Sequence, residues 1–540
     1  MPLFCNGSIG KDVSPMNRLT LFDSTLRDGA QGQGISFSVS DKLNILHLLD
    51  DLGVPYIEAG NPFSNPKDRE FFQKAAECQL DQAKLTAFGS TRRPGVPAEQ
   101  DPGLLALLAA NTGTVSIFGK ASAFHVEQIL RTDREENLSM IADSIRFLVR
   151  HGREVVFDAE HFFDGWKQEP AYAEMVLRTA EKAGASWLVL CDTNGGTLPD
   201  EVFHIVSTIK GKTSAPLGIH CHNDAGCAVA NSLLAVQAGA VQVQGTLLGF
   251  GERCGNANLS AILPTLQLKQ GYDCIPPERL RNLTHYVRAV GEVANVVPDA
   301  GMPYVGSSAF AHKGGMHIDG VMKVPASFEH IDPSQVGNQR NVLISEVAGR
   351  AAVSQILEDA ACKDSFDASK IVALIKEREY LGYQYEYAAA SLQLMVLRQQ
   401  GSFQPFFEVL YSRTIGEQEV ESGRSNASSA IVKIRVGDTC EIGGGEGEGP
   451  VHALDCALRK AVGRFYPSLE RMRLTDYKVR VIEPRDATAA KVRVLVETSD
   501  GREVWTTVGV SRDIINASLQ ACVDAIEYKL WMDSRRKEKA

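Results

Sequence analysis

The feature that most constrains the fold of this chain is a regular alternation, between residues 19 and 245, of short apolar runs with longer amphipathic stretches. Short β-branched runs that alternate with helical patterns predict βαβ units and a parallel sheet. Eight such strands fit a (β/α)₈ TIM barrel, and a doubly wound open sheet is the alternative. The candidate strands are Leu19–Asp23, Tyr56–Ala59, Lys84–Phe88, Val115–Phe118, Val155–Asp158, Trp187–Cys191, Leu217–His220 and Val241–Gly245.

Two features favour the barrel over the open sheet. The strand count is eight, and polar or glycine-rich residues follow nearly every strand, as in DSTLRDG, HCHND and GFGERCGNAN. Barrel active sites are built at the C-terminal ends of the strands. We therefore expect the chemistry of this chain at that end of the barrel.

Beyond the barrel the pattern changes twice. Residues 274–402 are mostly helical in pattern, with predicted helices at Ile371–Glu379 and Ala388–Gln399. From residue 403 onward, strand and helix patterns together predict a small α+β domain. The strand patterns are Ala430–Arg435, Tyr477–Glu483, Lys491–Thr498 and Glu503–Val510, and the helix patterns are Pro450–Val462 and Ile514–Tyr528.

The predicted organisation is thus an α/β chain with a TIM barrel, a helical linker or lid region and a C-terminal α+β domain. The ranges are an N-terminal tail at 1–16, the barrel at 17–273, the linker at 274–402, the α+β domain at 403–533 and a charged tail at 534–540.

Composition excludes several classes of partner. A net charge of −10 argues against nucleic acid, because neutralising phosphates needs a basic face. No run of 18 apolar residues predicts a membrane span, and the N-terminus lacks the apolar core of a signal peptide. Eleven scattered cysteines without a CxxC pair predict reduced thiols in a cytoplasmic protein.

Two histidines at the end of the seventh strand are the strongest local signal. Residues i and i+2 of a strand point to one face, so His220 and His222 project together and could hold a divalent metal. The alternative is a pair of hydrogen-bonded histidines at a strand end. Asp28 follows the first strand and Asn256 the eighth, and strands 1, 8 and 7 are neighbours in a closed barrel. This mixed set of ligands suits Mn, Mg, Co or Zn with positions open for a bidentate substrate.

Three further polar residues follow barrel strands. Arg27 could stabilise an oxygen that becomes negative, or could form a structural ion pair with Glu58 or Glu160. Glu160, after the fifth strand, is a candidate base or orienting group, although most exposed glutamates are only solvated. Thr193, after the sixth strand, could bind a substrate carboxylate or could be an ordinary turn threonine.

Outside the barrel, His317 and Asp319 lie in the glycine-rich segment Phe310–Gly320. They could belong to a lid that brings an acid/base group over the metal, and the alternative is an ordinary loop histidine.

The glycines of residues 443–449 (GGGEGEG) invite comparison with a phosphate-binding loop. No Lys-Ser/Thr follows them, and their two glutamates would repel a phosphate. We predict a flexible loop before the helix Pro450–Val462.

These motifs closely resemble those of the Claisen-condensing branch of the DRE-TIM metallolyase superfamily, which contains 2-isopropylmalate, homocitrate and citramalate synthases. The resemblance rests on DSTLRDG (23–29), GIHCHNDAGCAVANSL (218–233), GERCGNANL (251–259) and HKGGMHIDG (312–320). It implies that Asp28, His220, His222 and Asn256 hold a divalent metal. It also implies that Arg27 polarises a keto oxygen, that Thr193 binds the keto-acid carboxylate, and that Glu160, His317 and Asp319 supply acid/base chemistry.

Within that branch the chain is most similar to the pyruvate-using type, in FDAEHFFDG (157–165), SIFGKASAFHV (116–126) and EHIDPSQVGNQRNVLISEVAGR (329–350). The resemblance implies acetyl-CoA and pyruvate as substrates. In the C-terminal domain, GPVHALDCALRKAV (449–462) resembles the branch's regulatory and dimerisation domain, which implies a homodimer. The implied effector is an end-product amino acid, isoleucine for citramalate synthases or leucine for isopropylmalate synthases, and the alternative is a dimerisation module that has lost its ligand. One departure is Phe328, near the place where some relatives carry a tyrosine.

Four alternatives remain. The same chemistry could use 2-oxoisovalerate or 2-oxoglutarate, as in 2-isopropylmalate and homocitrate synthases. The chain could be a catalytically silent amino-acid-binding protein, although the full set of candidate site residues argues against decay. A barrel metallohydrolase is a weaker rival, because it has no use for the C-terminal domain.

Overall fold

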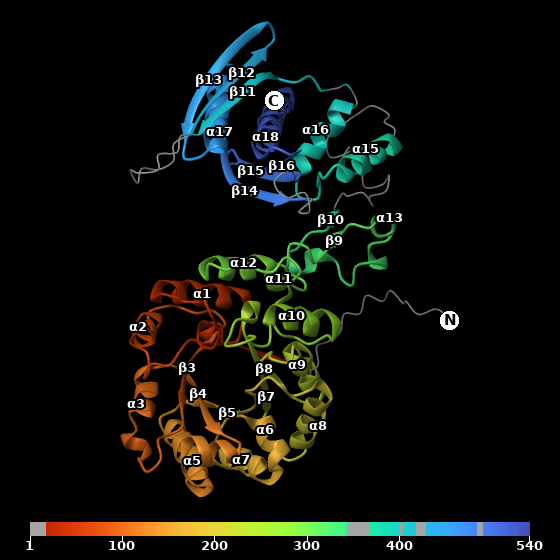
Figure 1. Cartoon of the computed structure of the whole chain (residues 1–540). Helices are drawn as coiled ribbons and strands as arrows, with labels where there is room; N and C mark the ends of the chain where they lie inside the picture. Colours follow the sequence, from red (N-terminus) through yellow and green to blue (C-terminus); the bar gives the residue numbers. More distant parts are fainter. Residues whose placement is uncertain are drawn as a thin grey trace, which may run out of the picture. The chain divides into compact units, whose positions relative to one another are not determined.

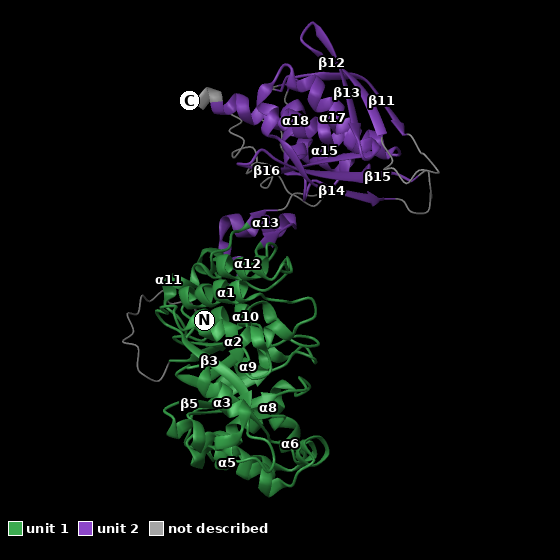
Figure 2. Cartoon of the chain, turned by 90° about the vertical axis from the view of Figure 1, so that its left-hand side faces the viewer, with its two compact units in different colours: residues 1–310, 331–340 green, residues 311–330, 341–540 purple. Residues whose placement is uncertain are grey.

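The computed structural model describes residues 18–342, 368–399, 401, 403–416, 428–482 and 490–539. The predicted tail at 1–16 and residues 343–350 of the similarity segment lie outside this range. The described chain divides into two compact units (Figure 2), residues 1–310 with 331–340 and residues 311–330 with 341–540. Each unit is described by itself below.

The first unit is a closed eight-stranded parallel barrel surrounded by helices (Figure 1). Its strands follow one another in chain order, and β1 closes the barrel by pairing with β8 in the register Phe22 opposite Gln244. The predicted TIM barrel is therefore confirmed and the open sheet is excluded. The strands are β1 Thr20–Asp23, β2 Tyr56–Glu58, β3 Lys84–Ser90, β4 Thr114–Lys120, β5 Glu154–Glu160, β6 Trp187–Asp192, β7 Leu217–Cys221 and β8 Gln242–Gly245.

Local sequence explains where the barrel helices begin and how they pack. In α1, the Ser38 side chain accepts a hydrogen bond from the Asp41 amide and the Asp41 carboxylate accepts one from the Ser38 amide, which forms a capping box. The spacing of Ile45, Leu49 and Leu52 then buries one face of α1 against the barrel core. The helices of this unit are α1 Val39–Leu52, α2 Pro66–Ala75, α3 Pro102–Ala109, α4 Ala123–His125, α5 Arg134–Arg150, α6 Phe162–Gln168, α7 Pro170–Ala183, α8 Pro199–Lys210, α9 Ala228–Gln237, α10 Leu259–Pro264, α11 Pro277–Leu280 and α12 Leu283–Val293.

The second unit begins with the segment that contains His317 and Asp319. The glycine-rich stretch forms the short strand β9 (Ala311–His312) and the helix α13 (Gly315–Lys323), and β9 pairs in parallel with β10 (Asn341–Val342). The two predicted linker helices are confirmed as α15 (Ala368–Tyr380) and α16 (Ala389–Gln399). Apolar residues of α15 and α16, such as Ile375 and Leu392, pack with Val508 in one small core.

The C-terminal part consists of two similar modules, each with three antiparallel strands and one long helix (Figure 1). Side chains from both helices and both sheets, such as Val432, Ala457, Val496 and Ala521, share one core. The helix α18 runs to Lys539 and so includes most of the segment predicted as a charged tail. The elements are β11 Glu408–Gly416, β12 Ser428–Val436, β13 Thr439–Gly447, α17 Pro450–Gly463, β14 Arg473–Val481, β15 Val492–Ser499, β16 Val504–Ser511 and α18 Ile514–Lys539.

The prediction of a flexible loop at the glycines of residues 443–449 is wrong for Gly443–Gly447, which lie in β13 and pair with β12. A Cβ atom on Gly443, Gly445 or Gly447 would overlap the backbone of α17, whereas one on Gly444 would meet nothing within 4 Å. Glycine at alternate positions therefore lets the helix lie directly on the strand. These glycines are needed because of a tertiary contact between β13 and α17. The local sequence carries no sign of that contact and therefore resembles a loop.

Candidate metal centre and active site

Three buried residues that could hold a metal ion meet at the C-terminal end of the barrel. The Asp28 Oδ2 atom lies 3.3 Å from His220 Nε2 and 3.8 Å from His222 Nε2, and the two Nε2 atoms are 3.4 Å apart. One ligand atom from each residue falls within 4.8 Å of the other two. Asp28 follows β1, His220 lies in β7 and His222 directly follows it, so neighbouring parts of the closed barrel bring them together.

The alternation of β7 explains why both histidines face the same point. His220 and His222 are two positions apart, and the intervening Cys221 faces the other way, into the hydrophobic core. Burial in this core also raises the pKa of the Cys221 thiol well above its usual range.

The fourth predicted ligand, Asn256, lies beside His222 through an antiparallel β-bridge. Its Nδ2 donates a 3.2 Å hydrogen bond to the Phe250 carbonyl, which fixes the amide. Its Oδ1 is buried and has no hydrogen-bond partner among the described residues. A buried acceptor without a partner is costly, and a bound cation would satisfy it. The donor set of one carboxylate, two imidazoles and one amide oxygen thus fits a divalent metal.

The protonation states of Asp28 and His222 suit cation binding. Burial alone would raise the pKa of Asp28, but the Arg27 guanidinium and His220 hold it well below its usual range, so Asp28 is a carboxylate. Burial and the neighbouring His220 lower the pKa of His222 to about 4, so its imidazole is neutral at pH 7. A carboxylate and a neutral imidazole are the forms that bind metals.

Arg27 lies beside the cluster in a fixed position. Its Nε donates to Glu58 Oε2 at 2.7 Å, its NH1 lies 3.3 Å from Asp28 Oδ2, and its guanidinium stacks 3.9 Å from the centre of the Phe88 ring. The ion pair with Glu58 that the sequence offered as an alternative is therefore present. This ion pair orients the Arg27 guanidinium toward the site. The structural contact is therefore compatible with a role of Arg27 in stabilising negative charge.

Glu160 and Thr193 both lie at the C-terminal ends of barrel strands, as expected. Glu160 ends β5 and forms an ion pair with Lys120, so it is not the partner of Arg27. Thr193 follows β6, and its Oγ1 accepts a 2.8 Å hydrogen bond from the His161 amide. His161 has a φ of 57°, a left-handed conformation that is uncommon outside glycine and that aims this amide at the threonine.

Sequence reasoning missed a polar network inside the barrel that supports His220. The Oε1 of Gln244 in β8 accepts a hydrogen bond from His220 Nδ1 at 3.1 Å, and its Nε2 donates to Asp158 Oδ1 at 3.2 Å. Asp158 also accepts from the Ser116 hydroxyl at 2.8 Å. Burial and the nearby Glu58 raise the pKa of Asp158 to about 6. The available signal was the polar residues at inward positions of otherwise apolar strands, as in Gln244 and Asp158.

His317 and Asp319 lie on α13 in the second unit, and the barrel cluster lies in the first unit. Both side chains are exposed. The His317 ring stacks on Phe328 with centroids 4.2 Å apart, and Asp319 Oδ2 accepts a 2.7 Å hydrogen bond from Lys323. Their part in acid/base chemistry stays a prediction.

Three family models match consecutive parts of the chain. They are described as HMGL-like (residues 18–287), homocitrate synthase post-HMGL domain-like (residues 304–379) and LeuA allosteric (dimerisation) domain (residues 387–530). Together they follow the order of barrel, linker region and C-terminal modules.

Curated relatives match almost the whole chain. An (R)-citramalate synthase of Aquifex aeolicus is 48% identical over 96% of this chain and 98% of its own length. The chain belongs to the citramalate synthase family. Another (R)-citramalate synthase, from Geobacter sulfurreducens, is 48% identical over 95% of this chain and 98% of its own length.

Relatives of a different name are more distant. A probable 2-isopropylmalate synthase of Methanopyrus kandleri is 32% identical over 94% of this chain and 98% of its own length. The HMGL-like group depends on a divalent metal, in agreement with the donor set at the barrel's end. Among the described residues, no helix is both long enough and apolar enough to cross a membrane.

Proposed function

We propose that this chain condenses acetyl-CoA with pyruvate and water to give (R)-citramalate and CoA. The observation that carries the proposal is the identity of 48% with (R)-citramalate synthases over nearly the full length, in a chain with Asp28, His220 and His222 grouped at the barrel's end. The 2-isopropylmalate synthases, at 31–32% identity, make 2-oxoisovalerate the second candidate keto acid.

Asp28, His220, His222 and Asn256 would hold the divalent metal. When bound there, the metal would act as a Lewis acid on the ketone of the keto acid. Arg27, held by Glu58, would donate to the oxygen that becomes negative as the new carbon–carbon bond forms. The Thr193 hydroxyl, oriented by the His161 amide, would bind the keto-acid carboxylate.

Several proton transfers complete the balance. A base must take a methyl proton from acetyl-CoA, the carbanion then adds to the ketone carbon of pyruvate, and the oxygen that becomes negative takes up a proton to give the hydroxyl group. Water must next hydrolyse the thioester and release CoA as a thiol. Glu160, which is paired with Lys120, and the α13 residues His317 and Asp319 are the proposed acid/base groups for these transfers.

The C-terminal domain would regulate the enzyme. Its match to the LeuA allosteric (dimerisation) domain supports a homodimer, and we propose isoleucine as the effector. A cytoplasmic location belongs to the same proposal. The metal, taken from Mn, Mg, Co or Zn, would be identified by its content in the purified protein.

A panel of keto acids tests the proposed function, with CoA thiol release from acetyl-CoA as readout. Pyruvate should give the highest kcat/KM, and isoleucine should lower the rate. Chelation should abolish turnover, and His220→Ala should lose bound metal. Preference for 2-oxoisovalerate over pyruvate, or full turnover in metal-free buffer, would contradict the proposal.

A further inference from the structure

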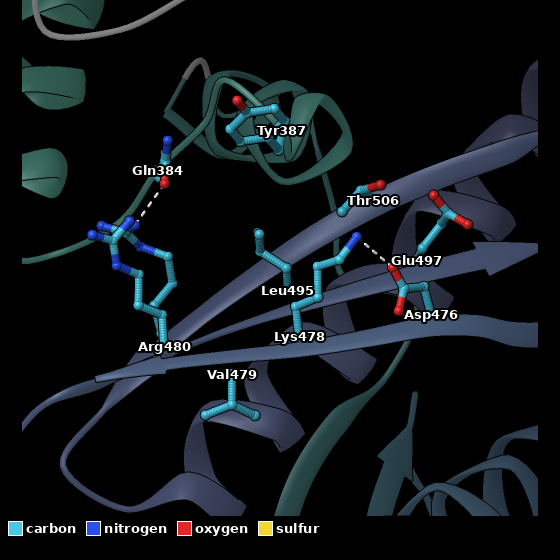
Figure 3. A pocket seen from close by; sticks show the side chains of 10 residues that line it. Gln384, Tyr387, Asp476, Lys478, Val479, Arg480, Leu495, Glu497 and Thr506 are labelled. Carbon is cyan, nitrogen blue, oxygen red and sulfur yellow. Dashed lines mark hydrogen bonds and ion pairs between the residues drawn. The ribbon is translucent and has the colours of Figure 1, made fainter. Parts of the chain in front are cut away.

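A groove of about 700 Å³ runs over the face of the β14–β15–β16 sheet that points away from α18. The strand pairing places Asp476 opposite Glu497, Lys478 opposite Leu495 and Arg480 opposite Arg493 on this face. Gln384 and Tyr387, which precede α16, line the other side (Figure 3). The groove thus lies within the second unit, between the linker helices and the sheet.

One end of the groove carries two arginines directly opposite each other on antiparallel strands. Like charges at such positions destabilise a sheet, because their Cβ atoms are only about 4.5–5.5 Å apart. Among the described residues, no carboxylate forms an ion pair with either guanidinium. Burial and the neighbouring Arg480 lower the pKa of Arg493, which agrees with a site of concentrated positive charge.

Arg493 is held in place from the linker side. Its Nε donates to the Gly382 carbonyl at 2.6 Å and its NH1 donates to Gln384 Oε1 at 2.6 Å. Both partners are neutral, and the Glu379 carboxylate, which raises the pKa of Arg493, offsets only part of the effect of burial and of Arg480. A guanidinium that is fixed by neutral partners and lies opposite a second arginine is well arranged for a carboxylate or a phosphate.

The other end of the groove is different. Lys478 lies 2.5 Å from Asp476 Oδ2, and Glu497 accepts a hydrogen bond from Thr475 at 2.9 Å. These charges are already paired or bonded. Leu495 lies between the two ends, and Tyr387, 61% exposed, presents its ring on the opposite wall (Figure 3).

We propose that this groove binds a small organic anion, whose carboxylate or phosphate lies between Arg480 and Arg493 and whose body packs on Leu495 and Tyr387. Binding would offset the repulsion between the arginines and would tie the segment around Gly382 and Gln384 to the sheet. The proposal does not depend on the reaction at the barrel, because none of its residues lies in the first unit.

Titration calorimetry on the full chain tests this site with two probes, succinate for the carboxylate and adenosine 5′-monophosphate for the phosphate. We expect at least one probe to bind, and Arg480→Gln to weaken that binding by about tenfold or more, as loss of a charge-assisted contact does. The matched control is Lys478→Gln, on the same strand and face, which should change the affinity by less than twofold because Lys478 is already paired. Tyr387→Ala should weaken only the probe that carries a ring.

Thermal unfolding provides a second readout. Without a probe, Arg480→Gln should unfold at or above the temperature of the parent chain, because the repulsion is gone, and the probe should raise the midpoint of the parent more than that of the variant. KM for acetyl-CoA and pyruvate should stay unchanged in Arg480→Gln. Equal affinity of parent and variant for both probes, or saturable binding of neither, would overturn the proposal.

Discussion

At the scale of single residues, the barrel's end owes its chemistry to side chains that are fixed by their neighbours. Asp28 is held as a carboxylate by Arg27, and His220 is oriented by Gln244. The grouping of Asp28, His220 and His222 was predictable from the sequence because strand alternation and barrel closure together determine where these side chains point. The contacts of Gln244 and Asp158 could not be predicted in this way. A polar residue within an apolar strand shows that it needs a partner, but the sequence does not show which residue across the barrel that partner is.

Gln244→Leu tests the supporting role of this network. The substitution keeps the volume but removes the acceptor for His220 Nδ1 and the donor to Asp158. Loss of such a supporting contact weakens metal binding by about 10–100-fold. Metal affinity by competition with a chelator is the measurement, and Gln244→Glu, which keeps an acceptor for His220, should retain more of it. An unchanged affinity in Gln244→Leu would show that His220 needs no support from β8.

At the scale of elements, all eight barrel strands were predicted close to their observed positions, because each is an apolar run bounded by polar residues. The strands of the C-terminal modules were harder. β12, β14, β15 and β16 alternate clearly, whereas β11 was missed and β13 was taken for a loop. Glycine has a low intrinsic preference for strands, so the local sequence argues against a strand here. Only the closeness of α17 explains why Gly443, Gly445 and Gly447 are needed.

Gly445→Ala tests the contact between β13 and α17. The new Cβ would lie 2.7 Å from the Ala453 carbonyl oxygen and 2.8 Å from Cys456 Cβ, so strand and helix must separate. Overpacking of this kind costs about 1–3 kcal/mol. The matched control is Gly444→Ala, the next residue, whose Cβ meets nothing within 4 Å and which should change stability by less than about 0.5 kcal/mol. Urea unfolding of the C-terminal domain is the measurement, and equal midpoints for the two variants would contradict the packing described.

Glu527 on α18 gives the C-terminal domain a dependence on pH. Burial raises its pKa from 4.5 to about 7, although its oxygens accept hydrogen bonds from the Phe406 and Phe407 amides. Between these pH values the folded state binds more protons than the unfolded chain, so the free energy of unfolding falls as pH rises. The shift corresponds to a contribution of about 3 kcal/mol to the free energy of unfolding. This contribution is fully present below pH 4.5 and is lost above pH 7.

Glu527→Gln should remove this dependence, because glutamine keeps the acceptor and carries no proton equilibrium. Comparing the unfolding midpoints of both proteins at pH 5 and pH 8 isolates the contribution of this residue. The unfolding midpoint of the variant should rise relative to that of the parent chain as pH rises. A parallel pH response in the two proteins would mean that Glu527 does not titrate in this window.

At the scale of the whole molecule, the C-terminal modules present an apolar face that the described chain leaves exposed. Tyr411, Ile431 and Ile442 lie on the side of the β11–β12–β13 sheet away from α17, with exposed fractions of 50%, 42% and 61%. Exposed apolar groups at this density mark association surfaces. Together with the LeuA dimerisation match, they indicate where a second copy would bind.

Sedimentation equilibrium should therefore find a particle of twice 58.7 kDa. Ile442→Asp should shift it toward the monomer, since a carboxylate would be buried in the interface. Val504→Asp is the matched control, because Val504 is 62% exposed on β16, outside this face, and should leave the dimer intact. A monomer at micromolar concentration for the parent chain would rule out the predicted assembly.

The alternate glycines of β13 also restrict how the length of this region can change. Deleting Cys440 would move every later residue of the strand by one place, so that Gly444, Glu446 and Glu448 would turn toward α17 in place of Gly443, Gly445 and Gly447. Deleting two residues would restore the original facing. Insertions and deletions that survive in this hairpin should therefore come in even numbers.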